Sequence, residues 1–405
     1  MNEDTQSNNS LVVDDRILPD SNLPTEYVEG LLDIANEGSG LLRRSYNGTE
    51  KDVYISGSQI RRFILKNGDL VGGLARRPKE NERYWGLLKV ETVNAIPIEQ
   101  MSQDRPSFDD LTAVYPDEQI KTATGSEPLT TRVIDLIAPI GFGQRALIVS
   151  PPKAGKTWLI KDIMSGIAQN YPEGKENGVH LMAVLIGERP EEVTDIGLHM
   201  KKITEGRGEV ASSNFDESPE KQTRISELAL DRAKRLVEVG QDVVIVLDSI
   251  TRLARAYNLA LPTSGRTLTG GFDPIALFPA KKFFGAARKI DGGGSLTIIG
   301  TSLVETGSRM DDLIYEEFKG TGNMELHLVR RLAERRVFPA IDVSRSGTRQ
   351  EELLYGTDLM PTILTLRRML DILHDDERTE SFLERLRKTQ NNEEFLATLK
   401  TAAKE

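Results

Sequence analysis

The residue types best suited to chemistry in this chain form one short run. It consists of Ser150, Pro151, Pro152, Lys153, Ala154, Gly155, Lys156 and Thr157, with Trp158 directly after it. Residues 146–149 predict a buried strand before the run, and residues 158–170 have helical periodicity after it. Backbone N–H groups and a helix dipole converge at such a loop and form a cradle for phosphate. We therefore predict a nucleoside triphosphate site in which Lys156 reaches the β- and γ-phosphates and the Thr157 hydroxyl ligates Mg²⁺.

A chance Gly-Lys-Thr is the alternative on spacing alone, because Ser150 stands where the phosphate-loop pattern has glycine. The end of a second predicted strand disfavours this chance interpretation. Residues 243–247 are continuously apolar and run into Asp248, where a carboxylate is placed to hold the water shell of Mg²⁺. Many buried strands end in Asp for capping reasons, so it is the pairing with the phosphate loop that favours this interpretation.

Another acidic side chain follows the apolar strand predicted at 181–186. Glu188 comes just past that strand, where a carboxylate can orient and polarise the attacking water. The alternative is that Glu188, Glu191 and Glu192 are all first-turn charges favoured by a helix dipole. We accept this alternative for Glu191 and Glu192, and we predict that Glu188 activates water.

These residues need a scaffold that brings the strand ends together, and the pattern from about residue 131 predicts one. Apolar strands are expected at 146–149, 181–186, 243–247 and 296–301, with helices at 158–170, 221–239 and 251–259. Such alternation predicts an α/β fold, a parallel sheet with helices on both faces. Because ligands bind at the carboxyl ends of such strands, Lys156, Glu188 and Asp248 are expected to meet there.

Three further segments of this region are unsuited to a packed core. Residues 261–271 are small and polar, which is typical of a functional loop in an α/β domain. Arg309, past the strand at 296–301, can reach a phosphodiester backbone. Arg345 and Arg349 flank a Gly turn, and such a turn can deliver an arginine finger to a nucleotide on a neighbouring subunit.

Composition excludes several other kinds of chemistry. The 405 residues include no cysteine and only four histidines, which rules out disulfides and thiol catalysis and disfavours a zinc site. No apolar run is long enough to span a bilayer, and the acidic start does not have the pattern of a signal peptide. We therefore expect a soluble, cytoplasmic protein without membrane contact.

The charge of the chain is distributed unevenly. The net charge of −10 disfavours indiscriminate nucleic-acid binding, yet residues 41–90 hold 11 Lys/Arg against 5 Asp/Glu. A basic island in an acidic chain is typical of a dedicated polyanion site, the alternative being a solvated basic face.

The basic island lies in a region whose pattern differs from that of the α/β domain. Residues 1–22 are polar and acidic and are expected to form a disordered tail. Residues 23–98 contain short β-type runs separated by Gly turns, which predicts a small all-β barrel of the oligonucleotide-binding (OB) type. Residues 99–128, with Asp, Pro and Ser throughout, are expected to be a linker, and residues 129–405 to form the α/β domain.

Taken together, these motifs resemble one family, the Rho transcription termination factors, which are hexameric RNA-dependent ATPases with a RecA-like motor domain. The resemblance runs from about Tyr27 to the C-terminus. Its most specific blocks are residues 151–157, 189–194, 248–257, 283–288, 315–326 and 345–354.

The resemblance implies a role for each matching residue of the nucleotide site. Lys153, Gly155, Lys156 and Thr157 match the phosphate loop, Asp248 the Mg²⁺-site acid and Glu188 the catalytic glutamate. Arg349 matches the trans-acting arginine finger, Arg189 a γ-phosphate sensor at the subunit interface, Lys319 another interface residue, and Phe338 the aromatic that stacks on adenine.

The resemblance also implies two sets of RNA contacts. Arg266 and Thr267 fall in a first RNA-gripping pore loop and Arg309 in a second. The barrel residues that match positions gripping pyrimidine-rich single-stranded RNA are Arg43, Asp52, Tyr54, Glu82, Arg83 and Tyr84.

The chain departs from the family pattern at several positions. Ser39 and Leu41 stand where relatives have two aromatic residues, which removes most of a flat stacking platform. Gly187 replaces a common acidic residue, and Thr267 a common aliphatic one. Residues 1–22 are not expected to supply the small helical subdomain that precedes the barrel in many relatives.

We therefore expect an ATP-driven homohexameric ring that uses ATP and Mg²⁺, threads single-stranded RNA and terminates transcription, with RNA polymerase and elongation factors as partners. One alternative is an RNA-binding regulator with a degenerate ATPase, which the intact Lys156, Glu188, Asp248 and Arg349 disfavour. Another is a RecA-like rotary ATPase subunit, which would have no use for the basic barrel or Arg309.

Overall fold

A computed structural model describes residues 24–102 and 104–402 of the chain. The described residues fall into two compact units. One contains residues 24–111 and Ile225–Val239, and the other contains residues 112–224 and 240–402. The predicted tail at 1–22 lies outside the described residues. The division at Leu111 falls within the segment expected to be a linker, 99–128.

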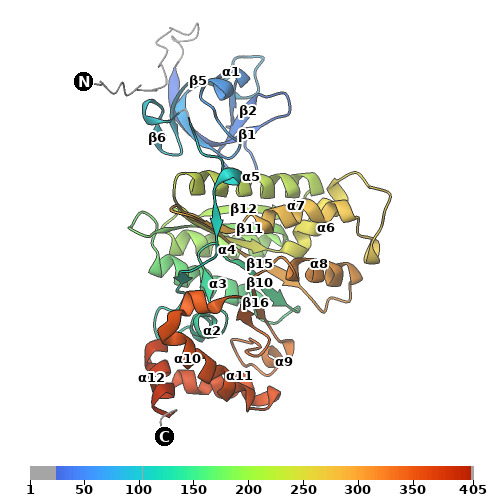
Figure 1. Cartoon of the computed structure of the whole chain (residues 1–405). Coiled ribbons are helices and arrows are strands. Elements are labelled where there is room, and N and C mark those ends of the chain that lie inside the picture. Colours follow the sequence, from blue (N-terminus) through green and yellow to red (C-terminus); the bar gives the residue numbers. More distant parts are fainter. Residues whose placement is uncertain (1–23, 103, 403–405) are drawn as a thin grey trace, which may run out of the picture. The chain divides into compact units, whose positions relative to one another are not determined.

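The first unit is built on a small β-barrel (Figure 1). Its strands are β1 (Thr25–Ile34), β2 (Gly40–Arg43), β3 (Val53–Ile55), β4 (Leu70–Arg76), β5 (Trp85–Val93) and β6 (Ile96–Pro97), and its helix is α1 (Gly57–Arg62). The strands pair in the order β3-β2-β1-β4-β5-β6, and β3 also pairs with β5, which closes the barrel. The sequence prediction of a small OB-type barrel is confirmed.

A shared apolar core explains why this unit folds. Apolar side chains such as Leu32, Leu42, Val53 and Val71 pack into it, and on the short strand β3 the exposed Tyr54 lies between the buried Val53 and Ile55. Helix α1 is closed by a capping box, in which Ser56 and the Gln59 side chain exchange hydrogen bonds with each other's backbone N–H.

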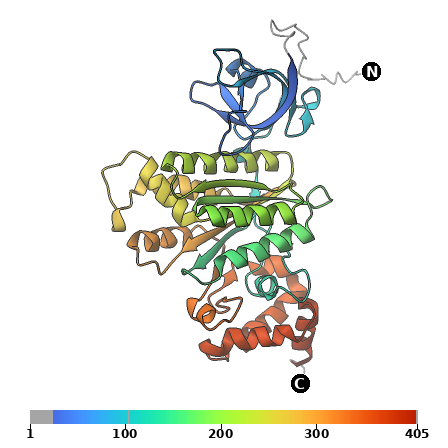
Figure 2. The same cartoon turned by 180° about the vertical axis from the view of Figure 1, so that it is seen from behind.

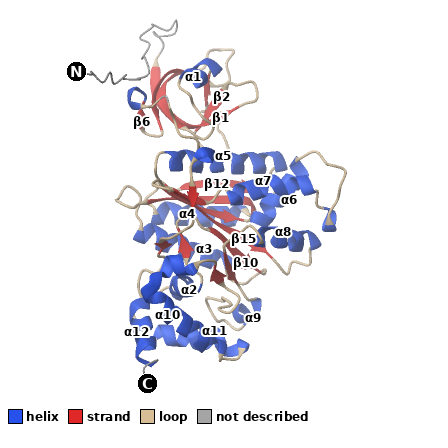
Figure 3. Ribbon diagram, viewed as in Figure 1, coloured by secondary structure: helices blue, strands red, loops and turns tan. Residues whose placement is uncertain are grey.

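The second unit contains the α/β sheet, with helices (blue in Figure 3) beside its strands. Its strands are β7 (Ala113–Val114), β8 (Gln119–Ile120), β9 (Ile140–Gly141), β10 (Arg145–Ser150), β11 (Val179–Glu188), β12 (Glu209–Asn214), β13 (Asp242–Asp248), β14 (Arg288–Ile290), β15 (Ser295–Leu303), β16 (Met324–His327) and β17 (Gly347–Thr348). Its helices are α2 (Leu129–Ile137), α3 (Lys156–Asn170), α4 (Pro190–Ile203), α6 (Ile250–Ala260), α7 (Pro274–Gly285), α8 (Arg309–Lys319), α9 (Arg330–Glu334), α10 (Glu351–Asp371), α11 (Asp375–Arg387) and α12 (Asn392–Ala402). The residues of α5 (Pro219–Glu238) are divided between the two units.

The main sheet runs in the order β12-β11-β13-β15-β10-β16-β17. All neighbours from β12 to β16 are parallel, and β17 is antiparallel to β16. The four strands expected from apolar runs are therefore present as β10, β11, β13 and β15, and the α/β prediction is confirmed.

Continuous apolar strands require cover on both faces, and the sheet has it. Helices α3 and α4 bury Ile163, Met200 and their apolar neighbours against one face. On the other face, a Cβ at Gly300 of β15 would meet Ile250 of α6 at 2.3 Å and Phe284 of α7 at 3.5 Å, so only glycine allows these helices to pack so closely. Figure 2 shows the sheet between the two groups of helices.

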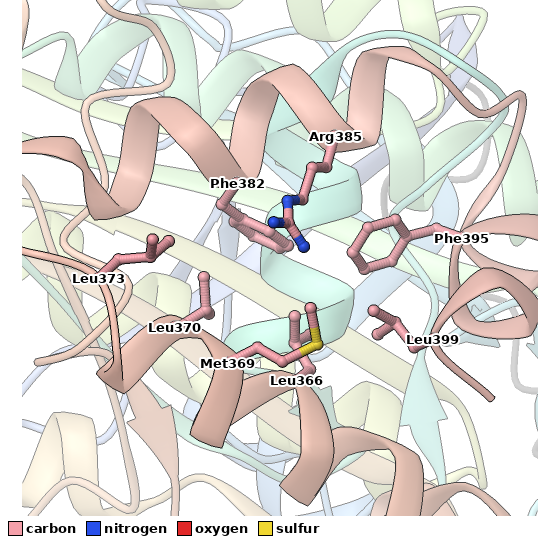
Figure 4. A pocket seen from close by; sticks show the side chains of 8 residues that line it. All are labelled: Leu366, Met369, Leu370, Leu373, Phe382, Arg385, Phe395 and Leu399. Atoms are coloured by element: carbon pink, nitrogen blue, oxygen red, sulfur yellow. The ribbon is translucent and has the colours of Figure 1, made fainter. Parts of the chain in front are cut away.

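The C-terminal helices are attached to the rest of this unit by a fully buried arginine of α2. The Arg132 guanidinium donates to the carbonyl oxygens of Leu386, Thr389 and Asn391 and to the side chains of Thr389 and Asn392, at 2.8–3.1 Å. All five of its N–H donors are thus paired with the turn between α11 and α12. Helices α10, α11 and α12 also enclose a small apolar pocket that the Arg385 side chain enters (Figure 4).

Candidate nucleotide and nucleic-acid sites

The phosphate-loop residues lie between β10 and α3, as predicted. Gly155 is the N-terminal cap of α3 and has φ of 93°, a conformation that favours glycine, and Lys153 also has positive φ, at 64°. Lys156 and Thr157 are the first two residues of α3, so their backbone N–H groups belong to the unpaired donors of a helix start. The loop therefore has the geometry of an anion cradle.

The Lys156 ammonium joins the ends of β11 and β13. Its Nζ lies 2.5 Å from Asp248 Oδ1 and 3.8 Å from Glu188 Oε1. Burial alone would lower the pKa of Lys156, but the charges of Asp248 and Glu188 outweigh burial and raise it. The three side chains expected to meet at the carboxyl edge of the sheet therefore do so.

Asp248 is held in place from a strand that the sequence did not connect with the site. Strand β15 lies between β13 and β10, and Thr301 on β15 donates its hydroxyl to Asp248 Oδ1 at 2.7 Å. A buried threonine on a central strand carries no sequence signal of such a role, and Thr301 is one residue that the sequence interpretation missed.

Glu188 has the environment of a perturbed carboxyl group. Its side chain is 1% exposed, and neither oxygen has a hydrogen-bond partner among the described residues. Burial, the neighbouring charge of Asp248 and the side chain of Glu192 together raise the pKa of Glu188 to about 8, against the opposing charges of Lys156 and Arg252. A buried carboxylate without a hydrogen bond, in a phosphate site, is placed to accept one from a water.

The backbone before Glu188 and a second arginine shape its surroundings. Gly187 has φ of 64°, and the pairing of β11 with β12 shifts register there. Arg252, also missed by the sequence interpretation, donates to the Gly187 carbonyl oxygen and places its Nε 3.2 Å from Glu188 Oε1. Arg252 therefore balances part of the charge that Glu188 carries when ionised.

The residues present fit a magnesium–nucleotide complex better than a metal bound by protein alone. Among the described residues, no group of three or more His, Asp or Glu side chains could hold a metal ion. Mg²⁺ keeps several waters and is commonly bound by one or two carboxylates together with substrate phosphates. Thr157 and Asp248 would hold Mg²⁺ in this way, and the unpaired oxygens of Glu188 fit a water beside it.

Two aromatic rings flank the phosphate loop. The Phe338 ring has two atoms at 3.5 and 3.7 Å from the position of a Cβ on Gly155, and its side chain is 45% exposed. Trp158 on α3 is 74% exposed and has the Lys161 ammonium 5.7 Å from its ring centroid. Phe338 thus lies beside the phosphate loop although it is far from the loop in sequence, and its contact with adenine stays a prediction of the family resemblance.

Arg189 and the glutamates after it begin α4. Arg189 is the exposed N-cap residue, and Glu191 and Glu192 are the acidic side chains of the first turn. The position of Glu191 and Glu192 agrees with the helix-dipole interpretation.

Two predicted catalytic residues lie at the opposite edge of the sheet. The Arg349 N–H donates to the Asn323 carbonyl oxygen at 2.9 Å, and the Asn323 N–H donates to the Arg145 carbonyl oxygen at the start of β10. Lys319 ends α8, four residues before Asn323. Arg349 and Lys319 therefore lie toward the amino ends of the strands, whereas Lys156, Glu188 and Asp248 lie at their carboxyl ends.

The two segments expected to grip RNA come together. Arg266 and Thr267 are exposed in the loop after α6, and Arg309 is exposed at the start of α8. A Cβ on Gly270 would lie 2.6 Å from the Met310 backbone nitrogen, so the two backbones are in contact. Arg255 on α6 holds the second segment, with its Nε donating to Asp311 Oδ1 at 2.8 Å. The sequence interpretation did not identify Arg255.

In the barrel, three of the residues expected to contact RNA, namely Arg43, Asp52 and Glu82, are already paired with other charged side chains of the barrel. Arg43 donates to Asp33 at 2.9 and 3.0 Å and to Asp52 at 2.9 Å, and Asp52 is fully buried. Glu82 accepts two bonds from Arg76, which lower the pKa of Glu82 to about 2.

The barrel residues that remain open to a ligand are fewer. Tyr54 is 45% exposed, and it is the cross-strand partner of Leu41. Arg83 is exposed and lies 5.2 Å from the Tyr84 ring centroid. The surface on β2 and β3 therefore offers one exposed aromatic ring beside an aliphatic side chain.

Fold and site together define a P-loop ATPase of the RecA-like class that carries a small RNA-binding-type barrel in the same chain. Residues 130–348 match the ATP synthase alpha/beta family nucleotide-binding domain, and residues 28–99 match the Rho termination factor RNA-binding domain. The chain is 54% identical over 375 residues to transcription termination factor Rho of Bacillus subtilis, with 92% of this chain and 84% of that protein covered. The chain belongs to the Rho family of transcription termination factors, as the resemblance predicted.

A second relative and a solved structure show how far the similarity extends. Transcription termination factor Rho of Aquifex aeolicus is 50% identical over 377 residues, with 92% of this chain and 84% of that protein covered. A solved structure of an ATPase from the type III secretion system of pathogenic bacteria has a TM-score of 0.59 at 21% identity, with 78% of this chain and 94% of that chain covered. At that identity the likeness shows the shared fold alone. The protein is accordingly an ATP-hydrolysing termination factor with an RNA-binding domain, and the interpretation as a rotary ATPase subunit is set aside.

Proposed function

We propose that this chain assembles into a homohexameric ring that hydrolyses ATP with Mg²⁺, pulls nascent single-stranded RNA through its centre and thereby releases the transcript. The barrel captures RNA, the loops carrying Arg266, Thr267 and Arg309 grip it, and hydrolysis between subunits drives movement. RNA polymerase and elongation factors are the expected partners, which places the protein in the cytoplasm. No helix of the described residues is both long and apolar enough to cross a bilayer.

The observation that carries this proposal is the position of Arg349 relative to the phosphate loop of its own chain. The Arg349 N–H donates to Asn323, whose own N–H donates to Arg145 at the start of β10. Ser150, at the end of β10, is five residues farther along that strand. At about 3.3 Å per residue the strand covers roughly 16 Å before the loop begins. An arginine side chain does not bridge that length, so Arg349 can complete a nucleotide site only on another copy of the chain.

In the proposed mechanism each side chain has a distinct task. Lys156 neutralises the β- and γ-phosphates, and Asp248 and Thr157 hold Mg²⁺, which stabilises the charge on the transferring phosphoryl group. Glu188 accepts a hydrogen bond from the attacking water and orients it. Arg349 of a neighbouring subunit stabilises the charge that develops, with Arg189 and Lys319 at the same interface, and Phe338 and Trp158 contact the base.

ATP turnover measured with and without single-stranded RNA homopolymers, alongside the mass of the assembly, tests this function. We expect turnover to rise several-fold with RNA and to occur in a species of six chains. Turnover that ignores RNA, in a species of one chain, would favour the alternative of an RNA-binding regulator with a degenerate ATPase.

A further inference from the structure

Asn323 forms a junction between three strands of the main sheet. Its side-chain oxygen accepts a hydrogen bond from Gln144 Nε2 at 2.7 Å and another from the Arg145 N–H at 2.9 Å. Its own N–H donates to the Arg145 carbonyl oxygen at 3.0 Å, and its carbonyl oxygen accepts the Arg349 N–H at 2.9 Å. One residue thus ties the start of β10 to the start of β16 and to the segment that follows β17.

The Arg349 side chain depends on this junction for its position. Within the described part of the chain, no hydrogen bond or ion pair to the Arg349 guanidinium is present, and the side chain is exposed. Its placement is therefore set by the backbone from which it extends. That backbone is fixed by the bond from the Arg349 N–H to Asn323, and one residue earlier by the Thr348 hydroxyl, which donates to the Pro139 carbonyl oxygen at 2.6 Å.

Loss of the Asn323 side chain would loosen the junction without touching the phosphate loop. Gln144 is 1% exposed, and without the Asn323 oxygen its side-chain nitrogen would keep only the bond to the Asn323 carbonyl oxygen at 3.1 Å. The Arg145 N–H would lose its partner. Unpaired donors of this kind favour a local backbone shift that brings them to water or to another acceptor. The shift would occur where Arg349 is attached, at the far end of β10 from Lys156.

We propose that Asn323 is a positioning residue for Arg349, and through it for the ATP site of the neighbouring subunit. This inference rests on the proposed trans-acting role of Arg349. Asn323 touches neither nucleotide nor the reacting atoms. It acts by fixing the backbone of Arg349, and so the position from which the Arg349 side chain reaches the neighbouring nucleotide. A displacement of about 1 Å at a catalytic group can cost about 100-fold in rate.

Kinetics of two substitutions test the side-chain contribution. Asn323→Ala is expected to lower RNA-stimulated kcat by roughly 10- to 100-fold while nucleotide affinity in an equilibrium binding assay stays unchanged. Asn323→Asp keeps a side-chain oxygen that can accept the bonds from Gln144 and from the Arg145 N–H, and it is expected to retain most of the activity. Asn170→Ala removes a similar pair of side-chain bonds, to the carbonyl oxygens of Lys121 and Ala123, and serves as the matched control with near-normal turnover.

Mixed rings separate a positioning role from a purely structural one. Asn323→Ala subunits keep an intact phosphate loop, and Lys156→Ala subunits keep an intact finger. Mixing the two is expected to restore activity at interfaces where an Asn323→Ala subunit binds the nucleotide in its phosphate loop and a Lys156→Ala subunit provides Arg349. Mixing Asn323→Ala with Arg349→Ala is expected to restore nothing, because both lack a working finger.

The reference mixture is Arg349→Ala with Lys156→Ala. If the reference recovers activity and the Asn323→Ala with Lys156→Ala mixture does not, Asn323 supports its own phosphate loop and the inference is overturned while the trans site stands. If the reference itself fails in confirmed mixed rings, the trans site is overturned and the inference with it.

Discussion

At the scale of single residues, the chemistry depends on three charged side chains that share one small volume. Lys156 lies near both Asp248 and Glu188, and Arg252 lies near the same Glu188 oxygen, Oε1. The two carboxylates differ in their surroundings, because Asp248 accepts bonds from Lys156 and Thr301 whereas neither Glu188 oxygen accepts a hydrogen bond from the described residues. Such a difference suits one carboxylate to a cation and the other to a water.

Substitution should separate these tasks. Glu188→Gln keeps the shape of the side chain but cannot accept a proton or polarise water, so turnover should fall by about 100-fold or more while nucleotide binding survives. Lys156→Ala removes the charge that cradles the phosphates and should weaken nucleotide binding itself. Equilibrium binding and steady-state ATP turnover of both variants check this, and wild-type-like turnover in Glu188→Gln would assign water activation to another residue, with Glu191 the next candidate.

The pKa of Glu188 predicts the pH dependence of catalysis. Because burial and Asp248 raise that pKa to about 8, kcat/KM for ATP should increase with pH up to about 8 as the carboxyl group loses its proton. The residual activity of Glu188→Gln should lack this increase. A wild-type profile that is flat between pH 6 and pH 8 would contradict the assignment.

The raised pKa of Glu188 also predicts how the free energy of unfolding changes with pH, because proton binding is linked to folding. The folded-state pKa of Glu188 lies above the ordinary glutamate value of 4.5, so between these two values the folded protein retains a proton that the unfolded chain has released. The contribution of Glu188 to the free energy of unfolding is therefore fully present below about pH 4.5 and decreases as pH rises toward 8. Urea denaturation without nucleotide should show Glu188→Gln gaining stability relative to the wild type over that range.

At the scale of elements, β2 and β3 decide how the barrel binds RNA. Leu41 and Tyr54 are cross-strand partners, and the Ser39 hydroxyl donates to Glu37 at 3.1 Å. With one exposed ring on this surface, base stacking contributes less and contacts to phosphate contribute more, and phosphate contacts do not read bases. RNA capture by this barrel should therefore be weak, sensitive to salt and only slightly selective for cytosine.

Restoring aromatic residues tests that expectation. Ser39→Phe with Leu41→Phe should tighten binding of short oligo-C by about 1–3 kcal/mol for each base that stacks. Because stacking does not depend on phosphate charge, the part of the binding free energy that is lost at high salt should become a smaller fraction of the total. Fluorescence anisotropy at two salt concentrations measures both effects in the full-length chain. Leu198→Phe, at a leucine of α4 that is 65% exposed, is the matched control. Tight, cytosine-selective binding by the unmodified barrel at moderate salt would refute the expectation.

At the scale of the whole molecule, the proposed active site needs more than one chain. The phosphate loop and Arg349 lie at opposite edges of the same sheet, so in the proposed ring each chain would contribute its phosphate loop to one site and Arg349 to another. Turnover per chain should accordingly fall by roughly 10³- to 10⁵-fold when the protein is diluted below the concentration at which it assembles. Light scattering at the same concentrations reports the assembly, and Arg349→Ala, whose residual activity should depend much less on concentration, is the control.

The sequence by itself determined the class of fold and most of the chemistry. Continuous apolar strands alternating with helices have few stable arrangements, so β10, β11, β13 and β15 could be predicted together with their shared carboxyl edge. Glu188 and Asp248 could be named because each is the last residue of a strand, and Lys156 because it begins the helix after the phosphate loop, where local pattern and function coincide. The barrel could be predicted for the same reason, from short strands and Gly turns.

Only the tertiary structure decided which distant residues meet. Thr301, Arg252 and Asn323 act through contacts with residues far away in sequence, and their types are common in any strand, helix or turn, so no local pattern marks them. The position of Arg349 at the amino edge of the sheet follows from the antiparallel pairing of β17 with β16, a two-residue strand too short to leave a periodic signal. The register of that pairing places the Arg349 backbone beside the start of β16, away from the phosphate loop of its own chain.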